Sequence, residues 1–297
     1  MTTTPDETTS AEVPAHHSEH RMQCMELWGG ISEIQTSVTM TGLDGYVFSR
    51  PHDQGTHGGD VYYFTSCASG RISRVLLADV SGHGMAVAET ADLLRSIMRR
   101  KVNVIGQSSL MSAVNEEFSK VAPGGGFATA IVASYFAPTK SLTISAAGHP
   151  PPLLFRKSTG LWTSFAATDA ELGMTSGLPL GIADDTNYEP QTITFEPGDI
   201  LLAYTDAFFE SRDADDRLLQ TDGLLQLINR APTRSHAELI SWLVGELQTI
   251  SPQNLTDDDA TAILIQPTGD GIPMKNNLLA PIRMIRGVQE VDAGGRN

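Results

Sequence analysis

The sequence predicts an α/β (α+β) sandwich, in which two packed and mainly antiparallel β-sheets are flanked by helices. Three observations lead to this prediction. Neighbouring strand-like segments are joined by tight turns, which favours antiparallel pairing. Amphipathic helical segments occur in two pairs, each pair following a group of strands. Hydrophobic residues make up 40% of the 297-residue chain, enough to build a large core. Sheets stacked face to face with the helices outside satisfy this order of elements.

The first half of the chain contains strands followed by two helices. Residues 34–41 (IQTSVTMT) alternate in polarity, as a half-buried strand does. Residues 61–67 and 71–80 (VYYFTSC and RISRVLLADV) flank the short polar turn ASG and predict a hairpin. Residues 85–100 have apolar side chains at helical spacing and end on basic residues, which suit the helix dipole. Residues 109–121 predict a second amphipathic helix, which ends at the sequence PGGG.

The second half contains further strands, two helices and a closing strand, and the chain shows no internal repeat. Three strands are predicted at residues 127–138, 141–148 and 151–156. Residues 168–190 are rich in glycine and proline and predict a loop. Residues 191–206 (QTITFEPGDILLAYTD) predict another hairpin that turns at EPGD, where Asp199 is interpreted as a turn residue. Two helices and a closing strand follow, near residues 222–230, 235–250 and 260–266.

Composition divides the chain into three parts. Residues 1–26 are rich in Thr, Ser, Glu and Pro and predict a flexible N-terminal arm. Residues 27–267 are predicted to form the folded domain, and residues 268–297 a weakly patterned C-terminal tail. The three histidines within residues 16–20 are interpreted as part of a solvated arm, because nothing there arranges them around a metal ion.

Charge and cysteine content exclude several classes of function. The net charge of −15, with no cluster of Lys and Arg, argues against binding to nucleic acid or to an anionic membrane surface. Cys24 and Cys67 form no metal-ligand spacing, and a chain of this size does not need a disulfide. The N-terminal segment lacks the pattern of a secretory signal, and no apolar run approaches the roughly 20 residues of a membrane span. We therefore expect a cytoplasmic protein.

Four acidic residues in distinctive settings predict a site for divalent metal ions. Three of them lie at the end of an apolar run or beside glycines, where a strand holds a short acid at a fixed point. Oxygen ligands suit Mg²⁺ or Mn²⁺, whereas Zn²⁺ prefers His and Cys. Two such ions about 3.5–4 Å apart can activate a water for phosphoryl transfer. The four residues are Asp60, Asp79, Asp206 and Asp258.

Seven motifs in this order resemble one known family. They are GGDVYYF, ADVSGHGMAVA, FATAIVASYF, AAGHPPPLL, PLGI, EPGDILLAYTDAFFE and DDDAT, and together they cover about residues 45–266. They resemble the bacterial PPM-type phosphatases, which are similar to protein phosphatase 2C, and most of all the SpoIIE/RsbU-like branch. The resemblance implies a serine/threonine protein phosphatase that uses two Mn²⁺ or Mg²⁺ ions and forms no phosphoenzyme. It also implies a phosphorylated protein substrate, such as a STAS-domain anti-anti-sigma factor.

The resemblance assigns a role to each site residue. Asp60 and Asp79 are expected to bind the metal ions, with the backbone carbonyl of Val80 as a further ligand. Asp206 and Asp258 are expected to complete the shell of one ion. The family pattern Asp-Asp-x-Thr, counted back from Thr261, favours Asp258 over Asp257 and Asp259. His83 is a candidate proton donor to the leaving oxygen, and a role in holding the loop by hydrogen bonding stays open.

The acidic residues also have plainer explanations. Asp60 and Asp79 are alternatively turn acids that accept local amide hydrogen bonds. Asp206 is alternatively the N-cap of a short helix, and Asp258 part of an exposed charge run. His149 is interpreted as structural, because it lies at a turn before three prolines.

Three residues depart from the family pattern. Ala207 replaces the usual glycine after Asp206, and a positive φ there would cost an alanine about 1 kcal/mol or more. Tyr63 stands where an acid is common, and His57 where an apolar residue is usual. None of the three removes a predicted metal ligand. Ala207 leaves open a second function, a catalytically silent PPM fold that only binds a partner. A hydrolase acting on a small phosphate ester is a third, and regulation by a partner, by the arm or by homodimerisation is equally open.

Overall fold

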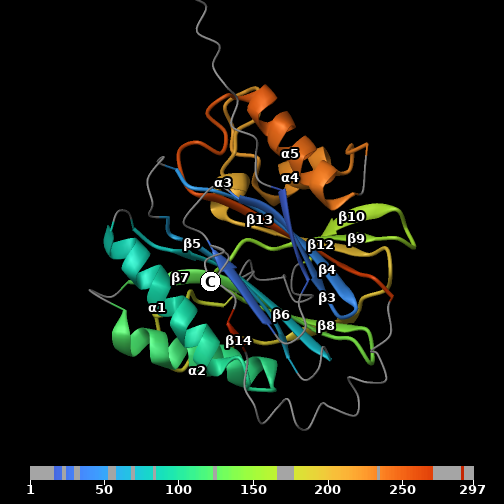
Figure 1. Cartoon of the computed structure of the whole chain (residues 1–297). Helices are drawn as coiled ribbons and strands as arrows, with labels where there is room; N and C mark the ends of the chain where they lie inside the picture. The colour runs from blue at the N-terminus through green and yellow to red at the C-terminus, as the bar shows by residue number, and fades with distance from the viewer. Residues whose placement is uncertain are drawn as a thin grey trace, which may run out of the picture.

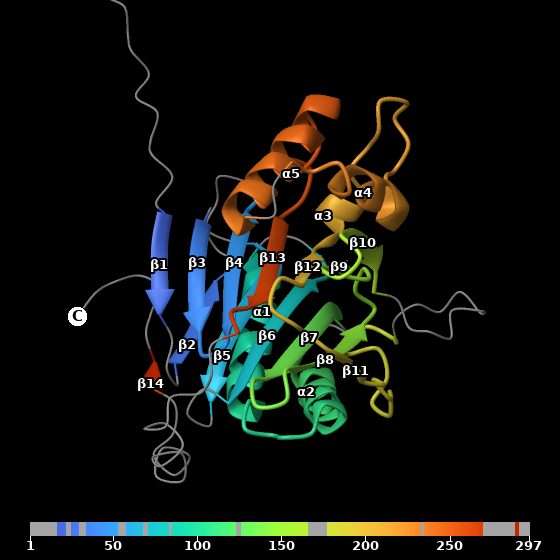
Figure 2. The same ribbon diagram turned by 90° about the vertical axis from the view of Figure 1, so that its right-hand side faces the viewer.

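The computed structural model shows two β-sheets packed face to face, with helices on both outer faces (Figure 1, Figure 2). It describes residues 17–21, 25–29, 34–52, 58–67, 71–82, 85–122, 126–165, 177–232, 235–269 and 289–290. Within these residues each sheet has seven strands, and most pairings are antiparallel. The predicted α/β (α+β) sandwich is therefore confirmed.

The strand orders place the two long hairpins at the centre of one sheet and the closing strand at the centre of the other. In spatial order, the first sheet contains β1 (His17–Arg21), β3 (Ile34–Met40), β4 (Leu43–Arg50), β13 (Ala260–Pro267), β12 (Ile200–Tyr204), β9 (Leu153–Arg156) and β10 (Leu161–Ser164). The second contains β11 (Gln191–Thr194), β8 (Ser141–Ala147), β7 (Ala128–Phe136), β6 (Ile72–Val80), β5 (Asp60–Cys67), β2 (Met25–Gly29) and β14 (Gln289–Glu290).

The helices cover the two outer faces in two groups. The group α1 (Met85–Lys101) and α2 (Gln107–Val121) packs on the second sheet. The group α3 (Asp206–Phe209), α4 (Gln220–Ile228) and α5 (His236–Ile250) packs on the first. The four long helices agree with the predicted ones. Among the described residues, no helix is both long and apolar enough to cross a membrane.

Three apolar layers hold the sandwich together, and β12 shows how one strand serves two of them. Ile200, Leu202 and Tyr204 face the helices α3–α5. Leu201 and Ala203 face the other sheet. All five side chains are buried, so the strand is a continuous apolar run. Complete burial of each such large side chain contributes roughly 1.5–3 kcal/mol.

The predicted hairpin at residues 191–206 is wrong. Its first strand, β11, pairs with β8 in the second sheet, whereas β12 pairs with β9 and β13 in the first. The turn itself is present, because the N–H of Asp199 donates to the Glu196 carbonyl at 2.9 Å. The chain changes sheets there because Phe195 is buried in the inter-sheet core, while β11 alternates as a half-exposed edge strand.

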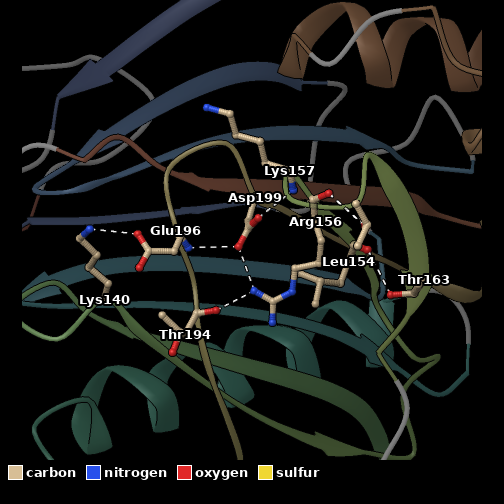
Figure 3. Close-up of polar contacts among 9 residues, drawn as sticks. Lys140, Leu154, Arg156, Lys157, Thr163, Thr194, Glu196 and Asp199 are labelled. Carbon is tan, nitrogen blue, oxygen red and sulfur yellow. Dashed lines mark hydrogen bonds and ion pairs between the residues drawn. The ribbon is translucent and has the colours of Figure 1, made fainter.

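Asp199 organises this corner between the sheets (Figure 3). Its buried carboxylate accepts hydrogen bonds from Arg156 Nη1 at 2.8 Å and from the main-chain N–H groups of Lys157 at 2.9 Å and Glu196 at 3.1 Å. Gly198 has a φ of +97°, and a Cβ there would lie 2.4 Å from Lys157 Cδ. Asp199 is therefore a turn residue, as predicted, although the turn does not close a hairpin.

Strands also lie in segments predicted to be unstructured. Within the predicted arm 1–26, residues 17–21 form β1, which pairs in parallel with β3, and β2 begins at Met25. In the predicted tail, Gln289–Glu290 pairs with β2. Strand β4 was not predicted either, although it pairs along its whole length with β13. These strands lack a clear alternation of polarity, so only their pairing partners reveal them.

Side chains of strand β2 connect the second sheet to helix α1. The buried carboxylate of Glu26 accepts a hydrogen bond from Tyr63 Oη at 2.6 Å and pairs with Arg99 Nε at 3.1 Å. A second contact also joins β2 to α1, because the guanidinium carbon of Arg95 lies 3.4 Å from the ring centroid of Trp28. Tyr63, which departs from the family pattern, therefore has a structural role between the sheet and α1.

Candidate functional site

Asp60 and Asp79 lie opposite each other at one end of the second sheet. They are directly paired residues in the antiparallel β5–β6 ladder. Side chains two residues away on the same strands, those of Tyr62 and Leu77, belong to the core between the sheets. Because side chains alternate along a strand, both carboxylates point toward the space between the two sheets.

Asp206 approaches this point from the other sheet. It follows β12 and is the first residue of the short helix α3. Thr205, rather than Asp206, is the N-cap of α3, so the helix-cap explanation of Asp206 does not hold. The carboxyl groups of Asp79 and Asp206 lie within hydrogen-bonding reach of each other. The two sheets thus bring together acids that are far apart in the sequence.

Crowding of buried acids raises their pKa values. Burial raises the pKa of Asp79 to about 7, and the charges of Asp206 and Asp258 add to the effect. Burial also raises the pKa of Asp206 to about 6, with a further contribution from Asp258. The pKa of Asp60 lies well above its usual range, again through burial first and the Asp79 charge second. Such a cluster is costly without a nearby positive charge.

The acids at 258 and 259 have different positions. Asp258 is exposed, and its carboxylate accepts the main-chain N–H of Asp259 at 2.8 Å. Asp259 instead accepts hydrogen bonds from the main-chain N–H groups of His52 at 2.8 Å and Gly59 at 2.5 Å. Its carboxylate thereby holds the residue before Asp60. This arrangement is compatible with Asp258 as the metal ligand and Asp259 as the group that positions the loop.

Two threonines support Asp60, and neither was among the predicted site residues. Thr205 Oγ1 donates to Asp60 Oδ2 at 3.0 Å and accepts the N–H of Thr261 at 3.0 Å. Thr261 Oγ1 lies 3.0 Å from Ser49 Oγ. Both threonines lie within the family motifs, Thr205 directly before Asp206 and Thr261 at the end of DDDAT, so the motifs could have pointed to them. The contact between Thr205 and Asp60 joins the first sheet to the second, so only the fold reveals it.

The carbonyl of Val80 lies beside Gly59 at the end of β6. The N–H of Val80 donates to the Gly59 carbonyl at 3.1 Å. A Cβ on Gly59 would lie 2.9 Å from the Val80 oxygen and 2.9 Å from Val87 Cγ1. Only glycine therefore allows this close approach, which explains the glycine before Asp60. The Val80 carbonyl and the Asp79 carboxylate border the same point, since the same Cβ would lie 3.7 Å from Asp79 Oδ1.

The structure describes two of the four remaining residues singled out in the sequence, His149 and Ala207. His83 and His57 lie outside the described residues. His149 is buried, and its Nδ1 lies 3.1 Å from Thr129 Oγ1, in agreement with a structural role. Ala207 is helical and is absent from the described non-glycine residues with positive φ, so the alanine carries no such strain. Burial raises the pKa of the Asp206 carboxyl, and the hydrogen bond that this carboxyl accepts from the Ala207 N–H offsets part of the rise.

Mg²⁺ or Mn²⁺ fits the chemistry of these residues. The donors are carboxylate and carbonyl oxygens, which hard divalent cations prefer. Burial first, and neighbouring carboxylates second, raise the pKa values of Asp60, Asp79 and Asp206, and a bound cation would favour the charged form of all three. In the part of the chain that the structure describes, no three His, Cys, Asp or Glu side chains already close around one point. The predicted ligands thus lie at one end of the sandwich, but their side chains are not yet arranged around a common metal position.

Comparison with known proteins identifies the family. Residues 69–268 match the family of stage II sporulation protein E (SpoIIE). The chain belongs to the SpoIIE family. Over 207 residues it is 23% identical to the phosphoserine phosphatase RsbU of Bacillus subtilis (strain 168), a match that covers 69% of this chain and 58% of RsbU. The resemblance predicted from the motifs is confirmed.

Solved structures of other proteins share the fold of this SpoIIE-family chain. The RsbU and RsbW domains of Rv1364c from Mycobacterium tuberculosis match with a TM-score of 0.64 and 24% identity, over 78% of this chain and 63% of that one. The PP2C phosphatase domain of SpoIIE from Bacillus subtilis, solved with a regulatory fragment, gives a TM-score of 0.61 at 15% identity, over 76% and 64%. RsbX in complex with magnesium gives 0.58 at 14% identity, over 79% and 100%. The fold is therefore that of a PP2C-type phosphatase domain.

Proposed function

We propose that this chain is a metal-dependent serine/threonine phosphoprotein phosphatase that uses two Mn²⁺ or Mg²⁺ ions. The observation that carries the proposal is the meeting of Asp60, Asp79 and Asp206, with Asp258 close by, at one end of a SpoIIE-family sandwich. Their mutual charge repulsion is relieved by divalent cations. A structure of the relative RsbX in complex with magnesium supports the choice of ion.

The chain's own residues would hold the ions and keep the reacting groups in place. Asp60, Asp79, Asp206, Asp258 and the Val80 carbonyl are the proposed ligands. Bound Mn²⁺ or Mg²⁺ would supply a water of lowered pKa and neutralise charge that develops on the phosphoryl group.

Other groups at the site would position these ligands or transfer protons. Thr205 fixes Asp60 through its hydroxyl, and Asp259 fixes the segment before Asp60. His83 is the proposed proton donor to the leaving serine or threonine oxygen.

The proposed substrate is a phosphorylated partner-switching regulator, such as a STAS-domain anti-anti-sigma factor. The similarity to RsbU, which is named a phosphoserine phosphatase, supports a phosphoserine substrate. A cytoplasmic location and the absence of nucleic-acid binding go with this proposal, and the net charge of −15 supports the latter.

Phosphate release measured with and without metal tests the proposal. We expect the purified chain to hydrolyse p-nitrophenyl phosphate and a phosphoserine peptide with Mn²⁺ or Mg²⁺, and EDTA to abolish both activities. Asp79→Asn should remove at least about 99% of the activity, because metal stabilisation of the transition state is worth several kcal/mol. Full activity in a metal-stripped sample would refute the mechanism. Metal binding without turnover would instead favour the silent, partner-binding module.

A further inference from the structure

Large apolar side chains are exposed beside the candidate site. Phe127, Leu178 and Ile182 are 39%, 43% and 49% exposed, respectively. We call these three residues the apolar rim. They come from two segments, one leading into β7 and one within the long connection from β10 to β11. Exposed apolar side chains that gather in one place on a folded domain indicate a surface that another molecule covers.

Phe127 is hydrogen-bonded to Ser81, the residue that follows strand β6 and its two predicted ligands. The N–H and the hydroxyl of Ser81 both donate to the Phe127 carbonyl, at 3.0 and 2.8 Å. The N–H of Phe127 donates back to Ser81 Oγ at 3.2 Å. Ser81 follows Val80, and Val80 pairs with Ala128 in the β6–β7 ladder. The exposed ring of Phe127 therefore lies next to the end of β6, where Asp79 and the Val80 carbonyl are found.

The other two residues flank a short strand-like contact with the same segment. Leu180 and Ala128 exchange two main-chain hydrogen bonds, at 2.8 and 3.0 Å. Gly181 has a φ of +87°, and a Cβ there would lie 2.8 Å from the Gly126 carbonyl oxygen. Since Gly126 precedes Phe127 and Gly181 precedes Ile182, these two rim residues come from adjoining backbone positions. Asn115 fixes this arrangement from α2, accepting the N–H of Gly181 at 2.9 Å.

We propose that the apolar rim binds the protein substrate through apolar side chains next to the phosphorylated serine or threonine. This inference rests on the proposed function and specifies its substrate class. A phosphorylated residue can reach Asp79 only if the polypeptide that carries it lies over the surface around the end of β6, and the rim is part of that surface. A small phosphate ester reaches the acids without covering the rim. Burial of two or three such side chains at an interface excludes water and favours binding.

Acidic residues next to the apolar rim add a preference for charge in the substrate. Asp184 and Asp185 are exposed and follow Ile182 closely in the sequence. Asn115 Nδ2 on α2 donates to the carbonyls of Ala183 at 2.7 Å and Asp184 at 3.3 Å, which holds this acidic segment against α2. The preferred partner therefore has apolar residues beside the phosphorylated site and a basic residue beyond them.

Two phosphoserine peptides of equal length and charge test the rim. One has leucine on both sides of the phosphoserine and the other has glycine. We expect kcat/KM with Mn²⁺ to be about tenfold higher for the leucine peptide, corresponding to about 1.4 kcal/mol of transition-state binding. Phe127→Ser and Ile182→Ser should each reduce this ratio, and together bring it to within about twofold of one. Phe136→Ser is the matched control, because Phe136 ends the same strand β7 at its far end and is 37% exposed. The control should keep the wild-type ratio.

Binding measured without turnover separates the rim from the catalytic proposal. In EDTA, fluorescence anisotropy of the labelled peptides should show tighter binding of the leucine peptide to the wild type, and this preference should be lost in the double variant. The proposal that the apolar rim binds the substrate would be overturned if the two peptides showed equal binding and equal kcat/KM. It would also be overturned if the double variant kept the preference for the leucine peptide. If neither peptide is hydrolysed but the binding preference holds, the catalytic proposal fails and the rim stands.

Discussion

Asp206 is the residue whose two explanations differ most in their chemistry. As a helix cap it would be replaceable by asparagine, which caps equally well. In the structure the N-cap is Thr205, and the Asp206 carboxyl lies within hydrogen-bonding reach of Asp79. A negative charge at this position is therefore unfavourable for the metal-free fold. We therefore expect the Asp206 carboxylate to serve in binding a cation.

Asp206→Asn should weaken metal-dependent turnover and leave the metal-free fold intact. We expect kcat to fall by about 100-fold or more and the Mn²⁺ concentration for half-maximal rate to rise. The melting temperature in EDTA should hold or rise, because charge repulsion with Asp258 and Asp79 is relieved. Mn²⁺ titrations of turnover and thermal melts in EDTA measure the two effects. Ala207→Gly is the neighbouring control and should leave activity equal or higher. Unchanged kcat and metal dependence in Asp206→Asn would remove Asp206 from the site.

His149 gives a prediction about acid stability. Burial lowers the pKa of this imidazole from 6.5 to about 3, so the folded chain keeps it neutral where the unfolded chain takes up a proton. Its contribution is complete above the unfolded pKa and is lost as the pH falls below about 6.5. Between pH 7 and pH 5 this loss amounts to about 2 kcal/mol of unfolding free energy.

A variant comparison isolates the histidine from the acids. The buried carboxyls of Asp60, Asp79 and Asp206 have raised pKa values and act in the opposite direction, since they favour the fold as the pH falls. They are present in both the wild type and His149→Gln. Urea unfolding at pH 7 and pH 5 should therefore show about 2 kcal/mol less loss in the variant than in the wild type. An equal loss in both proteins would mean that His149 is protonated in the fold.

At the scale of elements, the corner between β11 and β12 decides which sheet each strand joins. Local turn chemistry predicted a hairpin, because Pro-Gly-Asp between two apolar runs is typical of one. The buried Phe195 and the carboxylate of Asp199 instead anchor a crossing between the sheets. The predicted helices and the β5–β6 and β7–β8 hairpins were correct, since their periodicity and short turns are local properties.

Asp199→Ala should destabilise the whole domain without touching the candidate site. The change leaves Arg156 Nη1 and the N–H groups of Lys157 and Glu196 without their shared acceptor. Loss of a buried, charged acceptor costs about 3 kcal/mol. Asp213→Ala is a matched control, because Asp213 also accepts two main-chain N–H groups but lies in a more exposed turn. Its cost should be about 1 kcal/mol. Urea unfolding measures both, and equal costs would contradict a special role of the corner.

At the scale of the whole molecule, metal binding should stabilise the fold, because the ligands come from both sheets. An ion held by Asp60, Asp79 and Asp206 would join the ends of β5, β6 and β12. At a hundredfold excess of free metal over its dissociation constant, the stabilisation is about 2.7 kcal/mol. For a domain of this size each kcal/mol shifts the melting temperature by about 2–4 °C.

Thermal melts with and without Mn²⁺ check this expectation. We expect a rise of about 5–10 °C in saturating Mn²⁺, reversed by EDTA. The double variant Asp79→Asn, Asp206→Asn should show a much smaller rise, although its metal-free melting temperature should equal or exceed that of the wild type. An equal rise in both proteins would place the stabilising ion elsewhere.

Local sequence patterns predicted most of the elements and proposed the four acids. Periodicity and turn residues are local, so α1, α2, α4, α5 and most strands were predictable. The order of the motifs gave the proposed set Asp60, Asp79, Asp206 and Asp258. Only the tertiary structure decided which strands are partners and what supports each acid. Thr205 and Asp60 are 145 residues apart, and His52 and Asp259 are 207 apart, yet both pairs are hydrogen-bonded. The segments that carry Phe127 and Ile182 likewise lie side by side only because Leu180 pairs with Ala128. Such contacts depend on how the two sheets pack, and that packing is set by the buried core as a whole rather than by any short stretch of residues.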